Sequence, residues 1–435
     1  MADVRPLHGI RYVRESVSDL AQVVTPPFDV ISKEAQANYY ARHPYNCIRL
    51  ELGQAEPSDN TLNNVYTRAA VTLSEWRLSN ILRQDFVPCF YLYQQRFTYD
   101  AQTYTRTSLM ARVRLEPWNA HVVLRHEHTL AKAKKDRLQL LRACATNFSP
   151  IMSIYDDPQG RIRRLLSSYA SEPEVQIVDE VDEEHRFQPI TDAHHIALIQ
   201  DFFSQRQLYV ADGHHRYETA LAYRDEILAQ RKELHPDDAV NFVMMALIDV
   251  DDPGMLVLPT HRLLFGLSME ALSKLSNEHF AQYFTVQPLG MEETAEVLLR
   301  RLKQAGETQP SFVLSTKDAV WLLSLNERGR RRMEQTGRTA AWNALDVAVA
   351  HTLVLEELLG LSAADMTAGT HVRYVQGADE ALQAVQRGEA QVALLLNGTR
   401  VRQICDVALA DDRMPQKSTY FYPKLITGLV MNPLW

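Results

Sequence analysis

A predicted strand that passes into a helix through one aspartate and one glycine constrains the fold more than any other feature of this chain. Residues 209–211 end an apolar strand, and residues 217–229 have the pattern of a helix. Asp212 and Gly213 join the two, and glycine permits the tight turn that such a junction needs. A strand followed directly by a helix favours a mixed α/β or α+β fold.

The start of this helix has the chemistry of an anion-binding site. The first N–H groups of a helix have no partner within the helix, and the helix dipole favours negative charge there. The residues that follow the glycine are His214, His215 and Arg216. Arg216 can hold a phosphate through two hydrogen bonds, and Asp212 can hold Mg²⁺ or orient a histidine. The alternative is that Asp212 only caps the helix and that both histidines are solvated.

The chain of 435 residues is long enough for two or three packed units. We expect soft boundaries near Glu116 and Leu267. The expected parts are an N-terminal extension with a helix and a β-hairpin (1–115), a core that contains the histidine-rich motifs (116–266), and a C-terminal α/β domain that ends in PQKSTYFYPK (267–435).

Periodic apolar residues and β-branched runs predict the other elements. Predicted helices span residues 60–82, 268–284, 291–305 and 340–359. Predicted strands form a hairpin (90–99 and 104–115), a buried strand (241–250) and two further strands (311–315 and 319–325). A strand, helix, strand order is expected over residues 372–396.

The charge balance argues against nucleic acid as a partner. Lys and Arg number 46 against 54 Asp and Glu, which gives a formal net charge of -8, whereas a protein that coats nucleic acid needs a clustered basic face. The four cysteines are far apart and form no C-x-x-C pair, which is typical of reduced thiols in a cytosolic protein. The sequence has neither a signal-peptide pattern nor an apolar run of membrane-spanning length. We expect a cytoplasmic protein without a membrane partner.

A second cluster of chemically active residues precedes a basic helix and runs from Arg125 to Thr129. A glutamate among histidines and lysines is held ionised, as a general base must be, and Glu127 fits that role. The metalloprotease pattern H-E-x-x-H is not met, because His126 and His128 are two residues apart and cannot share one helical face. The alternative is a solvated basic turn.

Two further clusters combine cations with hydroxyls. Lys417, Ser418 and Thr419 lie in an acid-free segment that can bind phosphate or carboxylate, or that can close a core through its aromatic residues. His261 and Arg262 are a weaker candidate, because such a pair usually lies on the surface. The sequence contains no Walker G-x-x-x-x-G-K-[ST] and no helix-opening G-x-G-x-x-G, which disfavours the common nucleotide-binding folds.

Five segments together resemble the domain of unknown function 1015 family, nearly from end to end. These segments are PPFDVI, HPYNCIRL, ADGHHRYETAL, LPTHR and MPQKSTYFYPKL. The resemblance is specific for membership and implies no particular activity.

A more distant likeness, over about Leu115 to Leu425, is to the free L-serine kinases, which have the ParB/sulfiredoxin-like fold. The His126-Glu127 segment, the Asp212–Arg216 loop and the late segment with PQKST occur in the same order in those enzymes. The likeness implies that the loop binds nucleotide phosphates and that Glu127 is the catalytic base. It also implies that the PQKST segment helps to hold substrate or phosphate.

We therefore expect a small-molecule kinase that transfers phosphate from ATP or ADP, with Mg²⁺, to a hydroxyl, and free L-serine is the best single acceptor. The alternative is a ParB-like nucleotide-binding switch without phosphate transfer. A metal-dependent hydrolase lacks the ligand spacing. The expected roles are catalysis (Glu127, Asp212, His215), nucleotide or phosphate binding (Gly213, His214, His215, Arg216), contact with substrate or phosphate (His126, Thr129, His261, Arg262, Lys417, Ser418, Thr419) and magnesium binding (Asp212).

Overall fold

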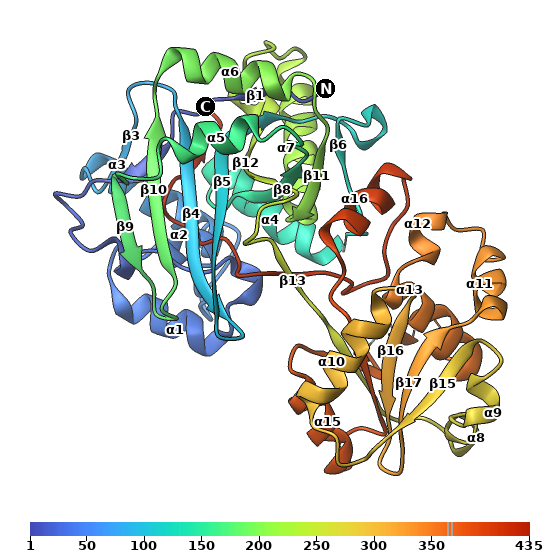
Figure 1. Cartoon of the computed structure of the whole chain (residues 1–435). Coiled ribbons are helices and arrows are strands. Elements are labelled where there is room, and N and C mark those ends of the chain that lie inside the picture. The colour runs from blue at the N-terminus through green and yellow to red at the C-terminus, as the bar shows by residue number, and fades with distance from the viewer. Residues whose placement is uncertain (130, 363–364, 367–368) are drawn as a thin grey trace. The chain divides into compact units, whose positions relative to one another are not determined.

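The structure is a computed structural model that describes residues 1–129, 131–362, 365–366 and 369–435 (Figure 1). The described residues form two compact units with mixed α/β structure. Unit 1 contains residues 1–125, 129–255 and 423–435, and unit 2 contains residues 126–128 and 256–422. The chain therefore leaves unit 1 twice and returns to it for the last segment.

The sheet of unit 1 has the strand order β6-β11-β8-β12-β5-β4-β10-β9, and β1 pairs with the far end of β5. The β6–β11 and β8–β12 pairs are parallel, and the other pairs are antiparallel. The strands are β1 (Val4–Arg5), β4 (Phe90–Tyr99), β5 (Gln102–Arg114), β6 (Val123–Leu124), β8 (Ile151–Tyr155), β9 (Val175–Val178), β10 (Glu184–Ile190), β11 (Leu208–Asp212) and β12 (Phe242–Asp249).

The predicted hairpin and the predicted buried strand are confirmed, and they lie in this one sheet. Asp100 and Ala101 both have positive φ, of 50° and 58°, which suits the tight turn between β4 and β5. Every residue of β12 is buried, and β12 pairs with β5 from Ser108 to Arg114. The expected boundary near Glu116 therefore lies inside unit 1, because strands from both sides of it share the sheet.

Helices pack on this sheet through apolar residues. Ile199, Phe202 and Phe203 of α6 join one buried cluster with alternate residues of β12. Unit 1 contains the helices α1 (Lys33–Arg42), α2 (Ile48–Glu51), α3 (Val65–Leu78), α4 (Ala131–Cys144), α5 (Arg161–Ser167), α6 (Ala193–Phe203) and α7 (His214–Arg231). It also contains the short strand pairs β2 (Ile10–Tyr12) with β3 (Leu82–Gln84), and β7 (Thr146–Asn147) with β21 (Asn432–Pro433).

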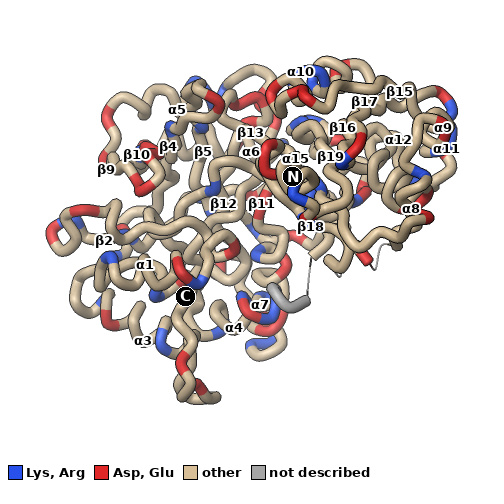
Figure 2. The backbone as a smooth tube through the Cα atoms, turned by 90° about the horizontal axis from the view of Figure 1, so that it is seen from below, with Lys and Arg blue, Asp and Glu red and all other residues tan. Residues whose placement is uncertain are grey.

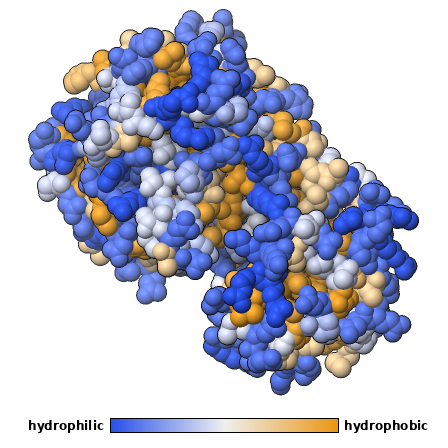
Figure 3. Space-filling view, in the orientation of Figure 1, coloured by the Kyte–Doolittle hydropathy of each residue, from blue (hydrophilic) through white to orange (hydrophobic). Residues whose placement is uncertain are grey.

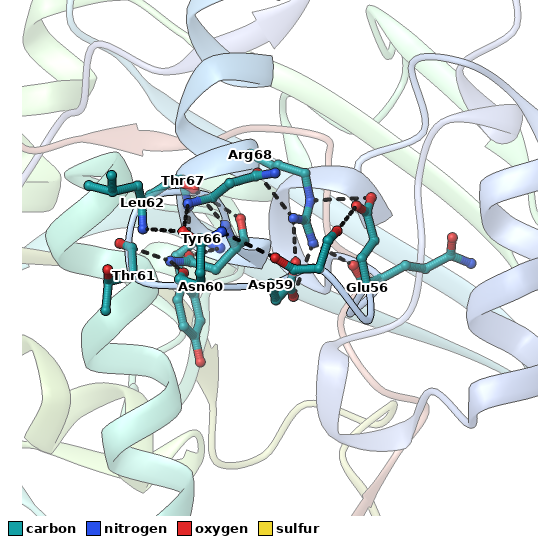
Figure 4. Close-up of polar contacts among 12 residues, drawn as sticks. Glu56, Asp59, Asn60, Thr61, Leu62, Tyr66, Thr67 and Arg68 are labelled. Atoms are coloured by element: carbon teal, nitrogen blue, oxygen red, sulfur yellow. Dashed lines mark hydrogen bonds and ion pairs between the residues drawn. The ribbon is translucent and has the colours of Figure 1, made fainter.

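The predicted helix over residues 60–82 begins later, at Val65, because Asn64 caps it. The Asn64 side chain accepts from the N–H groups of Tyr66 and Thr67, at 3.0 and 3.2 Å, and the Thr67 hydroxyl accepts from the Asn64 N–H at 2.9 Å. Such a reciprocal capping box fixes a helix start. The preceding residues form a polar turn in which Arg68 reaches back to Asp59 at 2.6 Å (Figure 4).

The sheet of unit 2 is antiparallel, with the order β15-β17-β16-β19-β14-β18. Its strands are β14 (His261–Leu264), β15 (Phe284–Leu289), β16 (Ser311–Ser315), β17 (Val320–Leu325), β18 (Val372–Val375) and β19 (Val392–Leu396). A separate pair joins β13 (Leu256–Leu258) to β20 (Tyr420–Tyr422). The predicted strand, helix, strand order of 372–396 is confirmed, and β14 lies between the two strands. Because β14 precedes Leu267, the expected second boundary lies inside unit 2.

Two predicted helices of unit 2 are wrong in length. Residues 268–284 form two short helices, α8 (Met269–Ser273) and α9 (Asn277–Phe280), because Ser276 caps a new helix through the His279 N–H and β15 begins at Phe284. Residues 340–359 form α12 (Ala340–Asn343), α13 (Asp346–Val349) and a π-helical segment (Ala350–Leu358). The remaining helices are α10 (Ala295–Gly306), α11 (Glu327–Glu334), α15 (Ala378–Gln386) and α16 (Val401–Leu409).

The surface is mostly hydrophilic on the face in Figure 3, with small separate apolar areas. Basic and acidic residues are interspersed along both units (Figure 2). Among the described residues, no helix has both the length and the apolar character needed to cross a membrane.

The buried Arg106 connects the last segment of the chain, residues 423–435, to the sheet of unit 1 through hydrogen bonds. The Arg106 side chain, 1% exposed, donates to Gln95 and, at 2.7 Å, to the Pro423 carbonyl. The Gln95 amide in turn donates to the Lys424 carbonyl at 2.9 Å. The backbone of Arg106 is packed so closely that a Cβ on Gly254 would lie 2.5 Å from its nitrogen and 2.6 Å from its Cα.

We predict that Gly254→Ala lowers the free energy of unfolding by about 3 kcal/mol, the upper end of overpacking effects, because backbone atoms cannot rotate away from the added methyl group. The matched control is Gly377→Ala, where the nearest atom would be 3.5 Å from the added Cβ and the loss should not exceed about 1 kcal/mol. Denaturant unfolding measures both changes. Equal effects of the two substitutions would contradict the close contact at Arg106.

Candidate functional site

Gly213 shapes the junction between β11 and α7. It has φ of +97° and is the N-cap of α7, without a side-chain capping bond. Asp212 ends β11, so the alternative in which Asp212 caps the helix is wrong. A Cβ at Gly213 would lie 3.0 Å from the Arg216 guanidinium, and the positive φ also favours glycine. The first turn of an 18-residue helix thus begins without a side chain over its N–H groups.

Asp212 is an ionised carboxylate between two cations. The Lys424 ammonium donates to Asp212 Oδ2 at 3.2 Å, and Arg216 Nη2 lies 3.5 Å from the same oxygen. Burial opposes ionisation, but the charges of Lys424 and Arg216 outweigh it and lower the pKa of Asp212 to about 2. Asp212 therefore carries a negative charge at neutral pH and holds both cations beside the start of α7.

A small cavity adjoins Arg216 within unit 1. Its volume is about 50 Å³, and its polar lining includes Glu51, Arg137, Ser149 and Arg216. Arg216 Nη1 donates to the Pro150 carbonyl, which fixes the guanidinium against the cavity wall. The wall of the cavity therefore combines charged and other polar groups with apolar side chains.

Glu51 is the buried acid of this cavity, at 3% exposed. Ser149 Oγ donates to Glu51 Oε1 at 3.0 Å, and Arg137 Nη1 donates to the Glu51 carbonyl at 2.9 Å. Burial raises the pKa of Glu51, and the nearby charges of Arg137 and Arg216 oppose that rise. The Arg137 guanidinium also lies 3.9 Å from the centre of the Phe28 ring, so segments that contain PPFDVI, HPYNCIRL and DGHHR meet here.

The other expected residues of α7 differ in their surroundings. His214 is buried, at 2% exposed, and His215 is half-buried. Burial lowers the pKa of His215, so its imidazole is neutral at pH 7. Both histidines lie in the first turn, as predicted.

Thr129 belongs to a neighbouring cluster around Glu218 in unit 1. The Thr129 hydroxyl donates to Glu218 Oε2 at 2.5 Å, and Arg125 and Lys134 each lie 2.9 Å from the same carboxylate. Glu218 and Trp118 also line a cavity of about 430 Å³ along α7. These contacts tie Thr129 to a carboxylate rather than leave its hydroxyl for an anion.

Two predicted motifs meet in unit 2. The Thr419 hydroxyl donates to Glu127 Oε1 at 3.2 Å, and His126 Nε2 lies 3.4 Å from the same hydroxyl oxygen. The Met414 N–H donates to the His126 carbonyl at 2.8 Å. Residues 126–128 and 414–419 are therefore in hydrogen-bond contact. They are distant in sequence, since 292 positions separate Glu127 from Thr419.

The side chains of His261, Arg262 and Ser418 form hydrogen bonds with backbone groups of unit 2. The Leu396 N–H donates to His261 Nδ1 at 3.2 Å, and burial lowers the pKa of His261 to about 4. Arg262 Nη2 donates to the Lys417 carbonyl at 3.2 Å, and Ser418 Oγ donates to the Pro415 carbonyl at 2.5 Å. His261 and Arg262 are buried, so the expectation that such a pair lies on the surface is wrong.

Glu127 belongs to unit 2 and the Asp212 loop belongs to unit 1. A kinase of the expected kind needs Glu127 and this loop in one cleft, and that cleft stays a prediction. Sequence reasoning missed Glu51 and Ser149 and gave Lys424 no partner. The sequence signal that could have identified Glu51 is its position directly after the segment CIRL, at the end of helix α2.

We predict that Asp212 stabilises the fold in a pH-dependent manner. Its pKa is depressed from 3.8 to about 2, so its contribution is present above the unfolded-state pKa and is lost as pH falls through the folded-state pKa. The difference in free energy of unfolding between wild type and Asp212→Asn should shrink by about 2 kcal/mol from about pH 5 to about pH 2. Asp201→Asn, at an exposed position of α6, serves as the control. A constant difference across this range would contradict the ion pairs.

Comparison with known proteins gives a family assignment. The family model described as "Protein of unknown function (DUF1015)" matches residues 4–348. The chain belongs to this family. No curated protein matches the sequence.

Solved structures give only weak likenesses. A conserved hypothetical protein from Pyrococcus furiosus has 10% identity and a TM-score of 0.34, over 74% of this chain and 95% of that chain. A free serine kinase in complex with AMP has 10% identity and a TM-score of 0.35, over 74% and 92%. SbnI from Staphylococcus aureus has 13% identity and a TM-score of 0.36, over 75% and 87%. Scores this low carry no argument about fold or activity, so the ParB/sulfiredoxin-like core stays a prediction.

Proposed function

We propose that this member of the DUF1015 family is a nucleotide-dependent small-molecule kinase, which transfers phosphate from ATP or ADP to a hydroxyl. Free L-serine is the first acceptor to test. One observation carries the proposal: the start of α7, whose N-cap Gly213 makes no side-chain capping bond, lies beside two cations, Lys424 and Arg216, that share the carboxylate of Asp212.

This arrangement suits the terminal phosphates of a nucleotide. Phosphoryl transfer depends on positioning and on neutralising negative charge more than on covalent chemistry. The N–H groups of the first turn and the helix dipole attract an anion. Arg216 and Lys424 add two positive charges, and neutral His215 can donate one N–H to a phosphate oxygen. Asp212 orients the cations without contacting the anion.

Mg²⁺ would reach this site with the nucleotide. Magnesium ions in such sites use one or two carboxylates together with substrate phosphates and water. Asp212 is an ionised carboxylate directly before the N-cap of α7. When bound, the ion would neutralise charge on the phosphates. Asp212 is the residue of this chain that would hold it.

The cavity beside Arg216 suits a small polar acceptor. Glu51 and Ser149 line it together with Arg216, and its volume of about 50 Å³ excludes large substrates. The Glu51 carboxylate, which already lies 3.5 Å from Arg137 Nη1, would in this proposal also pair with the ammonium group of an amino acid. This chemistry supports an amino-acid hydroxyl as the acceptor.

In this proposal Glu127 is the general base. The Thr419 hydroxyl, which itself lies beside His126 Nε2, donates to the carboxylate and orients it, as a base needs when it removes a hydroxyl proton. Lys417, which follows Gln416 in the same loop, would supply charge to the substrate or phosphate.

We predict that Arg216→Ala weakens nucleotide binding about tenfold to a hundredfold, because a charge-assisted hydrogen bond contributes about 1.5–3 kcal/mol. Arg231→Ala is the matched control, since Arg231 ends the same helix and is 62% exposed. Isothermal titration calorimetry with ATP and with ADP, each with Mg²⁺, measures the affinities. Equal affinities for wild type and Arg216→Ala would overturn the phosphate site.

We also predict that Glu127→Gln retains nucleotide binding and the fold but loses about 10²–10⁴ in transfer rate, because glutamine keeps the shape and cannot accept a proton. Glu278→Gln, at an exposed position of α9, should transfer phosphate at the wild-type rate. The assay measures phosphoserine formation beside a binding titration on the same samples. If the wild type forms no phosphorylated product from a panel of hydroxyl metabolites but changes its assembly with nucleotide, the nucleotide-binding switch replaces the kinase.

A further inference from the structure

A group of three potential metal ligands lies where β9 turns into β10 in unit 1, apart from the Asp212 loop in sequence. Asp179, Glu183 and His185 each offer one ligand atom, and these atoms all lie within 4.8 Å of one another. Asp179 directly follows β9, Glu183 directly precedes β10, and His185 is in β10. A short turn thus brings two carboxylates and one imidazole together.

The group is buried. His185 is 0% exposed, Glu183 is 6% exposed, and the Asp179 side chain is 9% exposed. Burial of charged groups is unfavourable unless a partner compensates the charge. Two acidic residues placed together therefore need a cation, a proton or both.

Two of the three side chains are held in fixed orientations. Asp179 Oδ1 accepts from the N–H groups of Val181 and Glu183, at 3.0 and 2.9 Å, which pins the turn. His185 Nδ1 lies 2.9 Å from Tyr93 Oη, and His185 Nε2 lies 3.1 Å from Asp179 Oδ2. Metal-binding histidines commonly bond through their second ring nitrogen to such a partner, which orients the ring and sets the tautomer.

Glu183 provides the independent observation. Within the part of the chain that the structure describes, its carboxylate has no hydrogen-bond or ion-pair partner, although its own N–H is bonded to Asp179. Glu183 is more than nine-tenths buried, and one of its carboxylate oxygens lies within 4.8 Å of the other two ligand atoms.

We propose that Asp179, Glu183 and His185 bind one divalent transition-metal ion, through two carboxylate oxygens and one imidazole nitrogen. The nitrogen ligand distinguishes this site from the all-oxygen sites of Ca²⁺ and Mg²⁺. Three ligands of this kind suit Zn²⁺, with water in the fourth position. The Irving–Williams order predicts tighter binding of Zn²⁺ than of Mn²⁺.

Binding of the metal ion changes only the protonation of its ligands, and no other covalent bond of the chain is altered. His185 coordinates through Nε2 and keeps its proton on Nδ1, from which it donates to Tyr93 Oη. Any second proton that the ring carries on Nε2 is released, as is any proton on Glu183. The ion ties the turn at 179–183 to β10 and, through Tyr93, to β4.

The test is binding of Zn²⁺ to the full-length chain with any affinity tag removed. Calorimetry and metal analysis should find one tightly bound Zn²⁺ per chain that Mg²⁺ does not displace. Glu183→Gln should weaken this binding more than about tenfold. Glu184→Gln is the matched control, because the adjacent Glu184 side chain bonds instead to Arg186 and Gln176, and it should bind Zn²⁺ like the wild type.

Further variants separate ligation from folding. Asp179→Asn retains the turn-forming oxygen and should also weaken Zn²⁺ binding, which keeps the test valid if Glu183→Gln fails to fold. Tyr93→Phe should weaken it about 10–100-fold, the usual effect of a group that orients a ligand. Co²⁺ should give visible ligand-field absorption that Glu183→Gln changes.

Two results would overturn the proposal. One is the absence of tight Zn²⁺ binding to the wild type. The other is equal Zn²⁺ affinity and an equal Co²⁺ spectrum in wild type and folded Glu183→Gln. Either would show that the pair of Asp179 and His185 is only a hydrogen bond that closes the turn. Nucleotide binding at α7 is measured separately, so the outcome does not depend on the kinase.

Discussion

Burial of the Arg106 charge in the central sheet of unit 1 determines where the last segment of the chain lies. A buried guanidinium needs acceptors for its hydrogen bonds, and Arg106 finds them in Gln95 and in the Pro423 carbonyl. Lys424 follows Pro423 directly, and its carbonyl accepts from Gln95. Its ammonium therefore reaches Asp212. One buried cation in β5 thus positions a second cation beside the start of α7, and the candidate phosphate site depends on both.

The local elements were predictable because their causes lie within short segments. Alternating and continuous apolar residues specify β4, β5 and β12, and Asp212 with Gly213 specifies the junction that begins α7. The errors also have local causes. Serine and asparagine side chains accept backbone hydrogen bonds and start new helices, so Ser276 divides one predicted helix and Asn64 delays another.

The partners of the site residues were not predictable, because they come from distant segments. Asp212 and Lys424 are separated by 212 positions, and Glu51 and Ser149 by 98. The strand register places His185 opposite Gln95 and Gln95 opposite Arg106, so a buried polar row crosses three strands. No single strand shows that row, since each of the three strands contributes only one of its residues. By contrast, the likeness that linked Glu127 with the PQKST segment named two regions that are in contact in unit 2.

The order in which the ribosome makes the chain has a consequence for unit 1. Residues 423–435 belong to unit 1, but they are synthesised after all of unit 2. Until they emerge, Arg106 lacks the Pro423 carbonyl and Asp212 lacks Lys424. Until then, the buried Arg106 and the half-buried Asp212 are incompletely paired. A polypeptide released before Pro423 would retain most of both sheets and lack the cation that completes the start of α7.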